Sequence, residues 1–268
     1  MIWRGLLVSV RNATEAAAAL DGGAAIIDIK EPAAGSLGAA TPDVIASIAA
    51  AVAGRAPLTV AAGELRDEMS NPGRTLRWFT AIKEHLGAAG GPVSAVPAAV
   101  KLGLAGMTAH RPTDWKDAFH ETMRGMSAET ATVAVAYADW MRVAAPDPRD
   151  VVAAGAEAGC DVFLIDTADK SHASLLRACD HDDLARWIAA GRAAGMAVAI
   201  AGRLAIDELP LVRPFAPDVV ALRSAVCFND RSGPVDVSLV RRAAAEVGLL
   251  EKVPRAATRD SSAPFAGA

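Results

Sequence analysis

The chain has 268 residues, and at roughly 150 residues per domain this length predicts one large domain or two small ones. Its 27 basic and 31 acidic side chains give a net charge of −4, which argues against a protein that binds the phosphate backbone of nucleic acid. Three cysteines without metal-ligand spacing indicate neither a disulfide framework nor a metal site.

Neither an export signal nor a membrane span is expected from the sequence. The apolar run at residues 1–10 is too short for a secretory signal, and the longest uncharged stretch, residues 86–100, is interrupted by glycines and prolines. We therefore expect a soluble, cytoplasmic protein that does not bind a membrane.

Short apolar runs alternate with segments of helical period from Gly5 to about Leu250. The short runs are continuously apolar, which is typical of parallel strands buried on both faces. Eight of them are expected to be strands: Gly5–Val10, Ala24–Ile29, Pro57–Ala62, Ala98–Leu102, Thr132–Tyr137, Asp161–Asp166, Ala197–Ala201 and Asp218–Leu222.

The segments between these runs begin with helix-start signals, either an Asn or Asp cap or a proline in the first turn. Six of them are expected to be helices: Ala13–Leu20, Asp43–Ala53, Arg74–Leu86, Thr113–Arg124, Arg149–Ala158 and His181–Ala194.

Eight such strand–helix units over about 250 residues match the size of a (β/α)8 TIM barrel. A doubly wound open sheet, the alternative, usually has fewer strands and a Gly-rich phosphate motif after its first strand, where this sequence has Arg11 and Asn12. We predict a single TIM-barrel catalytic domain over residues 1–250. Residues 251–268 have no apolar period and are expected to form a disordered tail.

Asp28 and Lys30 stand at the end of the second expected strand, and the ends of TIM-barrel strands form the active face. Because they are two residues apart, they face the same side of the sheet. A buried lysine beside a carboxylate suits amine catalysis, since burial lowers the lysine pKa and a neutral amine can attack a carbonyl. The structural alternative is a simple ion pair.

Two further lysines stand near the ends of later expected strands, one inside a strand and one in the loop after a strand. Lys101 lies inside an apolar run and is expected to face the barrel mouth, although it could also extend past the strand end into solvent. Asp166 follows four apolar residues, and Lys170 stands four residues later, from where it could fold back over Asp166 or remain a solvated loop charge. The candidate catalytic residues are therefore Lys30, Asp28, Lys101, Asp166 and Lys170.

The loops after the last two expected strands carry a phosphate-binding pattern. TIM barrels often bind phosphate there through loop amides, a helix N-terminus and a cation, so we predict a phosphorylated substrate. The alternative is that the arginines of these loops form structural ion pairs. With two polar residues at other strand ends, the candidate substrate-binding and phosphate-binding residues are Ser9, Asp139, Gly202, Arg203, Arg223 and Ser224.

These residues lie in segments that resemble the (5-formylfuran-3-yl)methyl phosphate synthase family, and the resemblance runs over most of the chain. The most specific segment is GGAAIIDIKEPAAGSLGA at residues 22–39. The other segments occur in the expected order: LLVSV (6–10), VKLGL (100–104), AYADWMRV (136–143), AGCDVFLIDTADK (158–170), AIAGRL (199–204) and ALRSAVC (221–227).

The resemblance implies a TIM-barrel lyase of methanofuran biosynthesis in C1 metabolism. Such an enzyme condenses two molecules of glyceraldehyde 3-phosphate, with loss of phosphate and water and with no metal or other cofactor. The resemblance also implies that Lys30 forms a Schiff base, that Asp28 and Asp166 act as acid and base, and that Lys101 and Lys170 complete the site.

Two alternatives remain open at this point. One is another Schiff-base aldolase that acts on small phosphorylated aldehydes without closing a ring. The other is a non-catalytic barrel that binds a phosphorylated metabolite. Apolar helix faces in so Ala-rich a chain further suggest a homo-oligomer.

Overall fold

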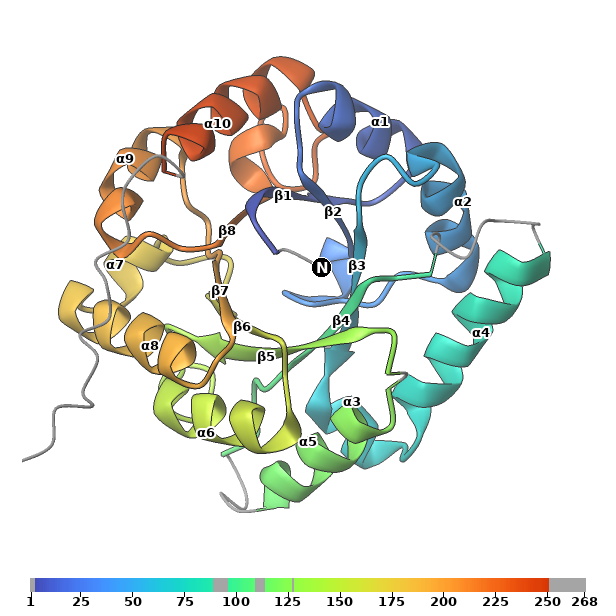
Figure 1. Cartoon of the computed structure of the whole chain (residues 1–268), viewed down its shortest axis with the longest axis vertical. Helices are drawn as coiled ribbons and strands as arrows, with labels where there is room; N and C mark the ends of the chain where they lie inside the picture. Colours follow the sequence, from blue (N-terminus) through green and yellow to red (C-terminus); the bar gives the residue numbers. More distant parts are fainter. Residues whose placement is uncertain (1–2, 89–95, 109–113, 127, 251–268) are drawn as a thin grey trace, which may run out of the picture.

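A computed structural model describes residues 3–88, 96–108, 114–126 and 128–250, so the expected tail at 251–268 lies outside the described residues. Eight parallel strands pair in chain order and close into a barrel, which is ringed by helices (Figure 1). The predicted (β/α)8 TIM barrel is confirmed.

All eight predicted strands are present, and their ends lie within two residues of the predicted ones. They are β1 (Gly5–Val10), β2 (Ile26–Ile29), β3 (Leu58–Glu64), β4 (Ala99–Gly103), β5 (Ala131–Tyr137), β6 (Val162–Asp166), β7 (Ala197–Ile200) and β8 (Val219–Leu222).

The six predicted helices are also present, with small shifts at their ends. They are α1 (Ala13–Asp21), α2 (Pro42–Val52), α4 (Arg74–Ala88), α5 (Asp114–Arg124), α6 (Pro148–Ala158) and α8 (His181–Ala193). Sequence reasoning did not assign α3 (Leu65–Ser70), α7 (Leu175–Ala178), α9 (Leu209–Val212), α10 (Val237–Leu250) or the 3-10 turns η1 (Pro32–Ala34), η3 (Ile206–Glu208), η4 (Arg213–Phe215) and η5 (Ser224–Val226). Most of these elements are too short to show a helical period.

The helix starts are fixed by the caps that the sequence contains. The Asn12 side chain accepts a hydrogen bond from the Glu15 amide at 2.9 Å, and Thr41, Asp147 and Asp180 cap α2, α6 and α8 in the same way. Each cap satisfies an amide that the first helical turn leaves without a partner.

The core has two layers. Apolar side chains such as Leu7, Val135 and Leu164 fill the barrel interior, and a larger layer packs between the outer face of the strands and the helices. This division explains why the strands are continuously apolar in sequence, since both of their faces are buried. Several polar groups nevertheless lie at or near the carboxyl ends of the strands, among them Ser9, Asp28 and Asp166.

The strand register aligns polar residues at these ends. Ser9 on β1 is paired with Asp28 on β2, which is paired in turn with Thr59 on β3. On the opposite side of the barrel, Tyr137 on β5 is paired with Asp166 on β6. Neighbouring paired residues point to the same side of a sheet, so the register itself builds the polar groups described below.

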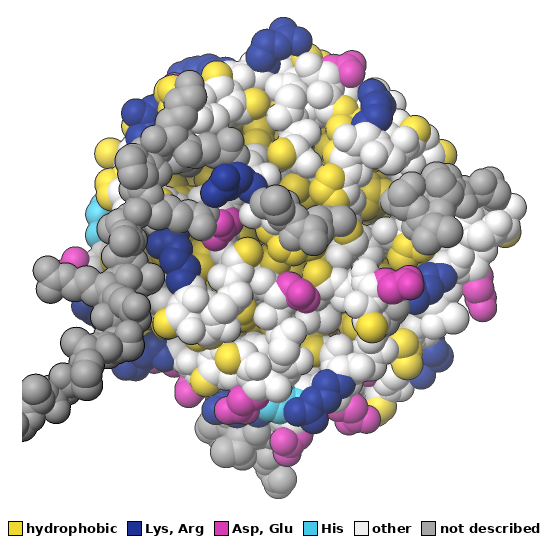
Figure 2. All heavy atoms as spheres, in the orientation of Figure 1, with side chains coloured by type: hydrophobic (Ala, Val, Ile, Leu, Met, Phe, Trp, Pro, Cys, Tyr) yellow, Lys and Arg dark blue, Asp and Glu magenta, His cyan; other side chains and the backbone are white. Residues whose placement is uncertain are grey.

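Acidic and basic side chains are interspersed on the face shown in Figure 2, in keeping with the nearly balanced charge of the chain. Among the described helices, none combines the length and apolar character needed to cross a membrane.

Candidate active site

A cavity lined by seventeen residues opens at the carboxyl ends of the strands. All five predicted catalytic residues line it, and so do five of the six predicted substrate-binding residues: Ser9, Gly202, Arg203, Arg223 and Ser224. Asp139 is absent from its wall.

Asp28 is fully buried at the base of this cavity and holds Lys101. Its Oδ1 accepts hydrogen bonds from Lys101 Nζ at 2.5 Å and from Thr59 Oγ1 at 2.7 Å, and its Oδ2 accepts one from Ser9 Oγ at 2.9 Å. Burial acts to raise the pKa of Asp28, but the charges of Lys101 and Lys30 and these hydrogen bonds outweigh it and lower the pKa. Asp28 is therefore a carboxylate at neutral pH.

Asp166 and Lys170 form a second ion pair, which is one of the two arrangements that the sequence left open for Lys170. Lys170 Nζ lies 2.6 Å from Asp166 Oδ1, which also accepts the Thr167 amide at 2.7 Å. Within the described ranges, no hydrogen bond reaches Oδ2 of Asp166. Burial acts to raise the pKa of Asp166, but Lys170 and Lys30 together lower it, so this carboxylate is also ionised.

Lys30 differs from the other two lysines, because its amine has no partner. It is 8% exposed, and no described residue forms a hydrogen bond or an ion pair with its Nζ. Burial lowers the pKa of Lys30 to about 8, against the attraction of Asp28 and Asp166 and assisted by repulsion from Lys170 and Lys101. The site thus contains a largely desolvated amine whose pKa is about 8.

The β5–β6 connection shows why Asp139 is outside the cavity wall. Its two carboxylate oxygens accept the amides of Ala168 and Asp169, each at 2.8 Å. Asp139 therefore holds the loop that carries Lys170. The sequence predicted that it would face the cavity, and it does not.

Loop amides are free on the wall formed by β7 and β8. Gly202 has a φ of +102° and lies where a Cβ would contact Thr167 and Leu175 at 3.1 Å, so glycine suits this turn. In the described part of the chain, the amides of Gly202, Arg203 and Ser224 form no hydrogen bond within the protein. Arg203 Nη1 donates to the carbonyls of Lys170 and His172, so this arginine also ties the β6 loop.

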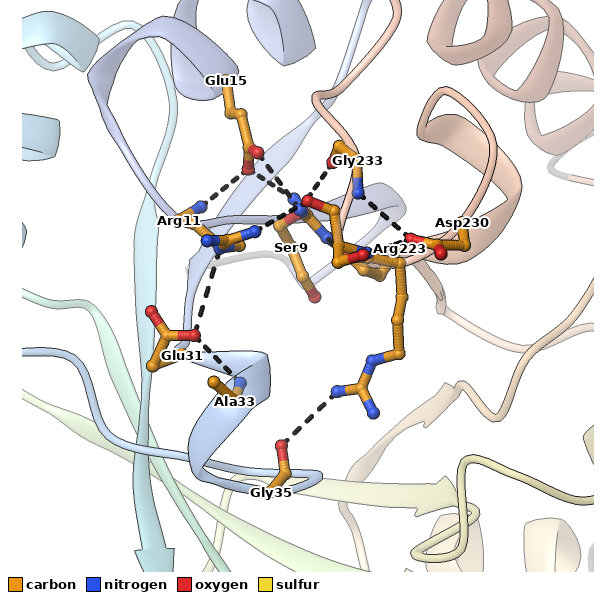
Figure 3. A network of polar contacts seen from close by, with 11 residues as sticks. Ser9, Arg11, Glu15, Glu31, Ala33, Gly35, Arg223, Asp230 and Gly233 are labelled. Carbon is orange, nitrogen blue, oxygen red and sulfur yellow. Dashed lines mark hydrogen bonds and ion pairs between the residues drawn. The ribbon is translucent and has the colours of Figure 1, made fainter.

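Arg223 adopts the structural alternative rather than the predicted phosphate contact (Figure 3). Its guanidinium is buried and forms a two-pronged ion pair with Glu15 at the start of α1. Its remaining donors reach the carbonyls of Ser9, Arg231 and Gly233 at 2.9 to 3.0 Å. All five N–H groups are used, so none is left for a ligand.

Sequence reasoning missed three residues of this region. Thr59, which supports Asp28, is a polar residue inside an apolar strand, but its contact with Asp28 depends on the pairing of β2 with β3. Glu15 is an acidic residue in the first turn of α1, and nothing near it in the sequence points to a partner after β8. Arg231 lines the cavity from an irregular turn, where no periodicity distinguishes a site residue from a solvated charge.

A further buried pair lies beside the cavity. Tyr137 donates a hydrogen bond to Glu64 Oε1 at 3.0 Å, and Glu64 Oε2 accepts the Ala105 amide at 2.9 Å. Burial raises the pKa of Glu64, and burial with the nearby carboxylates raises that of Tyr137 well above its ordinary value. This pair fixes the β4 loop next to Lys101.

No cluster of three or more His, Cys, Asp or Glu side chains in the described residues is arranged to hold a metal ion. The charged groups of the cavity are lysines, arginines and two aspartates, and both aspartates are already bonded to lysines. The cavity thus contains a buried lysine amine together with two carboxylates, each of which is bonded to another lysine.

Comparison with known proteins matches the chain to one protein family. The family model described as 4-HFC-P synthase matches residues 6–244. A (5-formylfuran-3-yl)methyl phosphate synthase of Methanosarcina mazei is 34% identical over 242 residues, which are 90% of this chain and 98% of that protein. The Methanopyrus kandleri protein of the same name is 35% identical over 242 residues, with 89% and 97% covered.

Among solved structures, 3-hexulose-6-phosphate synthase from Salmonella typhimurium is similar in fold. It superposes with a TM-score of 0.57 at 16% identity and covers 92% of this chain and 99% of its own. At this identity the similarity concerns the barrel alone.

Proposed function

Because the chain belongs to the family of (5-formylfuran-3-yl)methyl phosphate synthases, we propose that it condenses two molecules of glyceraldehyde 3-phosphate through a Schiff base on Lys30. The product would be (5-formylfuran-3-yl)methyl phosphate, formed with release of one phosphate and two water molecules. It would serve the biosynthesis of methanofuran or of a similar C1 carrier.

The observation that carries this proposal is the contrast between Lys30 and its two neighbours. Lys101 and Lys170 are each bonded to a carboxylate at 2.5 and 2.6 Å, so their positive charges are stabilised. Lys30 lines the same cavity, forms no hydrogen bond or ion pair with another described residue through its amine, and has a pKa of about 8. A neutral amine is the form that adds to an aldehyde carbon.

The first covalent step uses this amine. Lys30 Nζ donates its electron pair to the aldehyde carbon, and the carbonyl oxygen takes up a proton. Lys170 lies at the same wall of the cavity and is the proton donor that we assign to this oxygen. A proton then passes from the nitrogen to the hydroxyl group, water leaves, and the nitrogen lone pair forms the iminium.

Carbon–carbon bond formation requires a base for the carbon next to the iminium. Asp166 suits this role because its Oδ2 carries no hydrogen bond from the described residues and its pKa is lowered, so it is ionised and open. The proton passes to Asp166, and its bonding pair flows into the iminium to give an enamine. The enamine carbon then attacks the aldehyde of the second triose.

Asp28 has a different part in this scheme. Its two oxygens already accept three hydrogen bonds and it has no exposed surface, so we assign it to charge stabilisation rather than to proton transfer. It fixes Lys101, whose ammonium faces the cavity and would stabilise the alkoxide that forms on the second aldehyde. A hydroxyl group of the second triose then adds to the iminium carbon, and Lys30 leaves as the free amine. Elimination of water and phosphate then leads to the aromatic ring.

The free amides of Gly202, Arg203 and Ser224 are the place for a phosphate group in this proposal. Amides that point at a common space bind anions without carrying a full charge themselves. A phosphate held there would keep the triose aldehyde within reach of the strand ends that carry Lys30 and Asp166.

The proposal is tested by incubating the purified protein with glyceraldehyde 3-phosphate alone. We expect a furan absorption in the near ultraviolet, and borohydride reduction with substrate should leave a covalent adduct on Lys30 in mass spectra. Lys30→Arg should abolish both signals, because a guanidinium stays protonated and cannot add to a carbonyl. Lys83→Arg, a change at an exposed lysine of α4, is the matched control.

Other outcomes would replace the proposal. An open-chain sugar phosphate with an adduct on Lys30 would indicate an aldolase that does not close the ring. An unmodified protein that still binds the triose phosphate would indicate a non-catalytic barrel. Turnover by Lys30→Arg near the level of the unaltered protein would overturn the Schiff base.

A further inference from the structure

We infer that Arg231 is the cation that binds a substrate phosphate, and that the buried Arg223 positions it. The inference rests on the proposed function insofar as the substrate is a phosphorylated aldehyde. The sequence predicted Arg223 as the phosphate-binding arginine. The inference assigns this role to Arg231, which neither its position relative to a strand end nor a periodic pattern had indicated.

The first argument is the distribution of charge around the cavity. Six cationic side chains line it, and three of them are neutralised by a carboxylate: Lys101 by Asp28, Lys170 by Asp166 and Arg223 by Glu15. No carboxylate of the described residues lies within ion-pair distance of Arg231. Its guanidinium forms a single long hydrogen bond, from Nη2 to the Gly35 carbonyl at 3.4 Å.

An arginine has five N–H donors in a fixed fork, so four donors of Arg231 remain for a ligand. The same fork matches the oxygens of a phosphate in a two-pronged contact. The amides of Gly202 and Ser224, which form no hydrogen bond within the described protein, line the same cavity. A phosphate that bridged these amides and the guanidinium would satisfy both sets of donors.

The second argument is the way in which the turn at residues 230–233 is held (Figure 3). Arg223 donates to the carbonyls of Arg231 and Gly233 at 2.9 and 3.0 Å, and Arg11 donates to that of Ser232 at 2.8 Å. Asp230 accepts the amides of Ser232 and Gly233 from within the turn.

These bonds fix the backbone of the turn while the Arg231 side chain reaches the cavity. Glu15 keeps Arg223 in place from the other side. Arg223 is therefore a positioning residue, which acts on a ligand only through the turn. Burial, together with the nearby Arg223 and Arg203, lowers the pKa of Arg231 against the attraction of Asp166, and an anion bound in the cavity would act in the opposite direction.

The inference is tested with inorganic phosphate as the probe, by isothermal calorimetry at low ionic strength. Arg231→Gln should weaken phosphate binding roughly tenfold to a hundredfold, since hydrogen bonds to a charged group are lost. Arg231→Lys should lose less, because it keeps the charge without the fork. Arg242→Gln, an exposed arginine of α10, should bind phosphate as the unaltered protein does. Unchanged affinity in Arg231→Gln would overturn the inference.

The role of Arg223 is tested by a double-mutant cycle on the same readout. Arg223→Lys retains a charge but cannot form five hydrogen bonds, so it should also weaken phosphate binding. In the combined Arg223→Lys, Arg231→Gln protein, the loss should be no larger than in Arg231→Gln alone. Additive losses would show that Arg223 binds phosphate directly. Arg231 lies in a surface turn, so Arg231→Gln should fold. Its phosphate affinity tests the role of Arg231 even if the Arg223→Lys protein unfolds.

Steady-state kinetics separate this inference from the proposed function. If furan forms, Arg231→Gln should raise KM for glyceraldehyde 3-phosphate far more than it lowers kcat, because the contact persists through the reaction. If no furan forms, the proposed reaction is wrong. The role of Arg231 is then still tested by calorimetry, which measures the affinity for inorganic phosphate without turnover. A fall in kcat with an unchanged KM would overturn the assignment of Arg231.

Discussion

The charge balance around Lys30 can be altered by one substitution, Lys170→Met. Lys170 neutralises Asp166 at 2.6 Å, and both groups act on Lys30, the aspartate raising its pKa and the lysine lowering it. Without Lys170, the Asp166 carboxylate has no bonded cation and attracts the Lys30 ammonium in a buried space. The pKa of Lys30 should therefore rise from about 8 toward its ordinary value of 10.5.

The size of the effect follows from these two values. The depression of the Lys30 pKa corresponds to roughly 3 kcal/mol of preference for the neutral amine. Recovery of only about 1.4 kcal/mol would raise the pKa by about one pH unit. At pH 8 the neutral fraction would then fall from about a half to about a tenth, with a matching loss of nucleophile.

The assay is competitive acetylation of lysines across pH 6 to 11, read by mass spectrometry of the peptide that contains Lys30. It reports the pKa of this amine without requiring turnover, so the loss of a catalytic group does not hide the result. Lys83→Met is the control, since Lys83 is exposed on α4. A labelling midpoint that stays near 8 in Lys170→Met, or lies near 10 in the unaltered protein, would refute the electrostatic reasoning.

Three further predictions concern stability and support of the site. Lys30→Met should raise the thermal unfolding midpoint at pH 7, because a lysine whose folded pKa is depressed destabilises the fold below about pH 8. The gain should fade between pH 8 and 10.5, and circular dichroism at several pH values will show whether it does. Ser9→Ala removes one of three hydrogen bonds to Asp28 and should cost about 1 kcal/mol in urea unfolding, with a modest fall in kcat. Gly103→Ala would place a Cβ against the Glu64 carboxylate and the Tyr137 hydroxyl, and should lower urea stability by about 1 to 3 kcal/mol.

Each of these has a result that contradicts it. A Lys30→Met protein that is less stable than the unaltered one at pH 7 would mean that the ammonium is stabilised where it lies. Equal urea midpoints for Ser9→Ala would mean that solvent replaces the hydroxyl at Asp28. A fully tolerated Gly103→Ala would mean that Glu64 moves away at little cost; Gly87→Ala, at a position with open space around it, is its control.

The fold was predictable because strands that are buried on both faces consist almost entirely of apolar residues. Strands such as β6 read as unbroken apolar runs, and prolines or capping residues mark the helix starts between them. The catalytic candidates were predictable for the same reason, since Asp28, Lys101 and Asp166 each break an apolar run where a charge would otherwise be costly.

The phosphate region was harder to predict because its residues are distinguished by contacts across the chain. Arg223 and Arg231 are both arginines after β8, and nothing local shows which of them meets a carboxylate. The partner of Arg223 is Glu15, 208 positions away, brought near because β1 and β8 close the barrel. Only barrel closure makes one arginine structural and leaves the other open to the cavity.

The same closure explains how a chain with this many buried charges can stay folded. Each buried cation that serves as a support has a carboxylate bonded to it, as Lys101 has Asp28 and Arg223 has Glu15, so its desolvation is offset. Among the described residues, Lys30 is a buried cation to which no carboxylate is bonded, and burial lowers its pKa to about 8. The supports therefore fix the charges of the site around the amine that, in the proposed reaction, attacks the aldehyde.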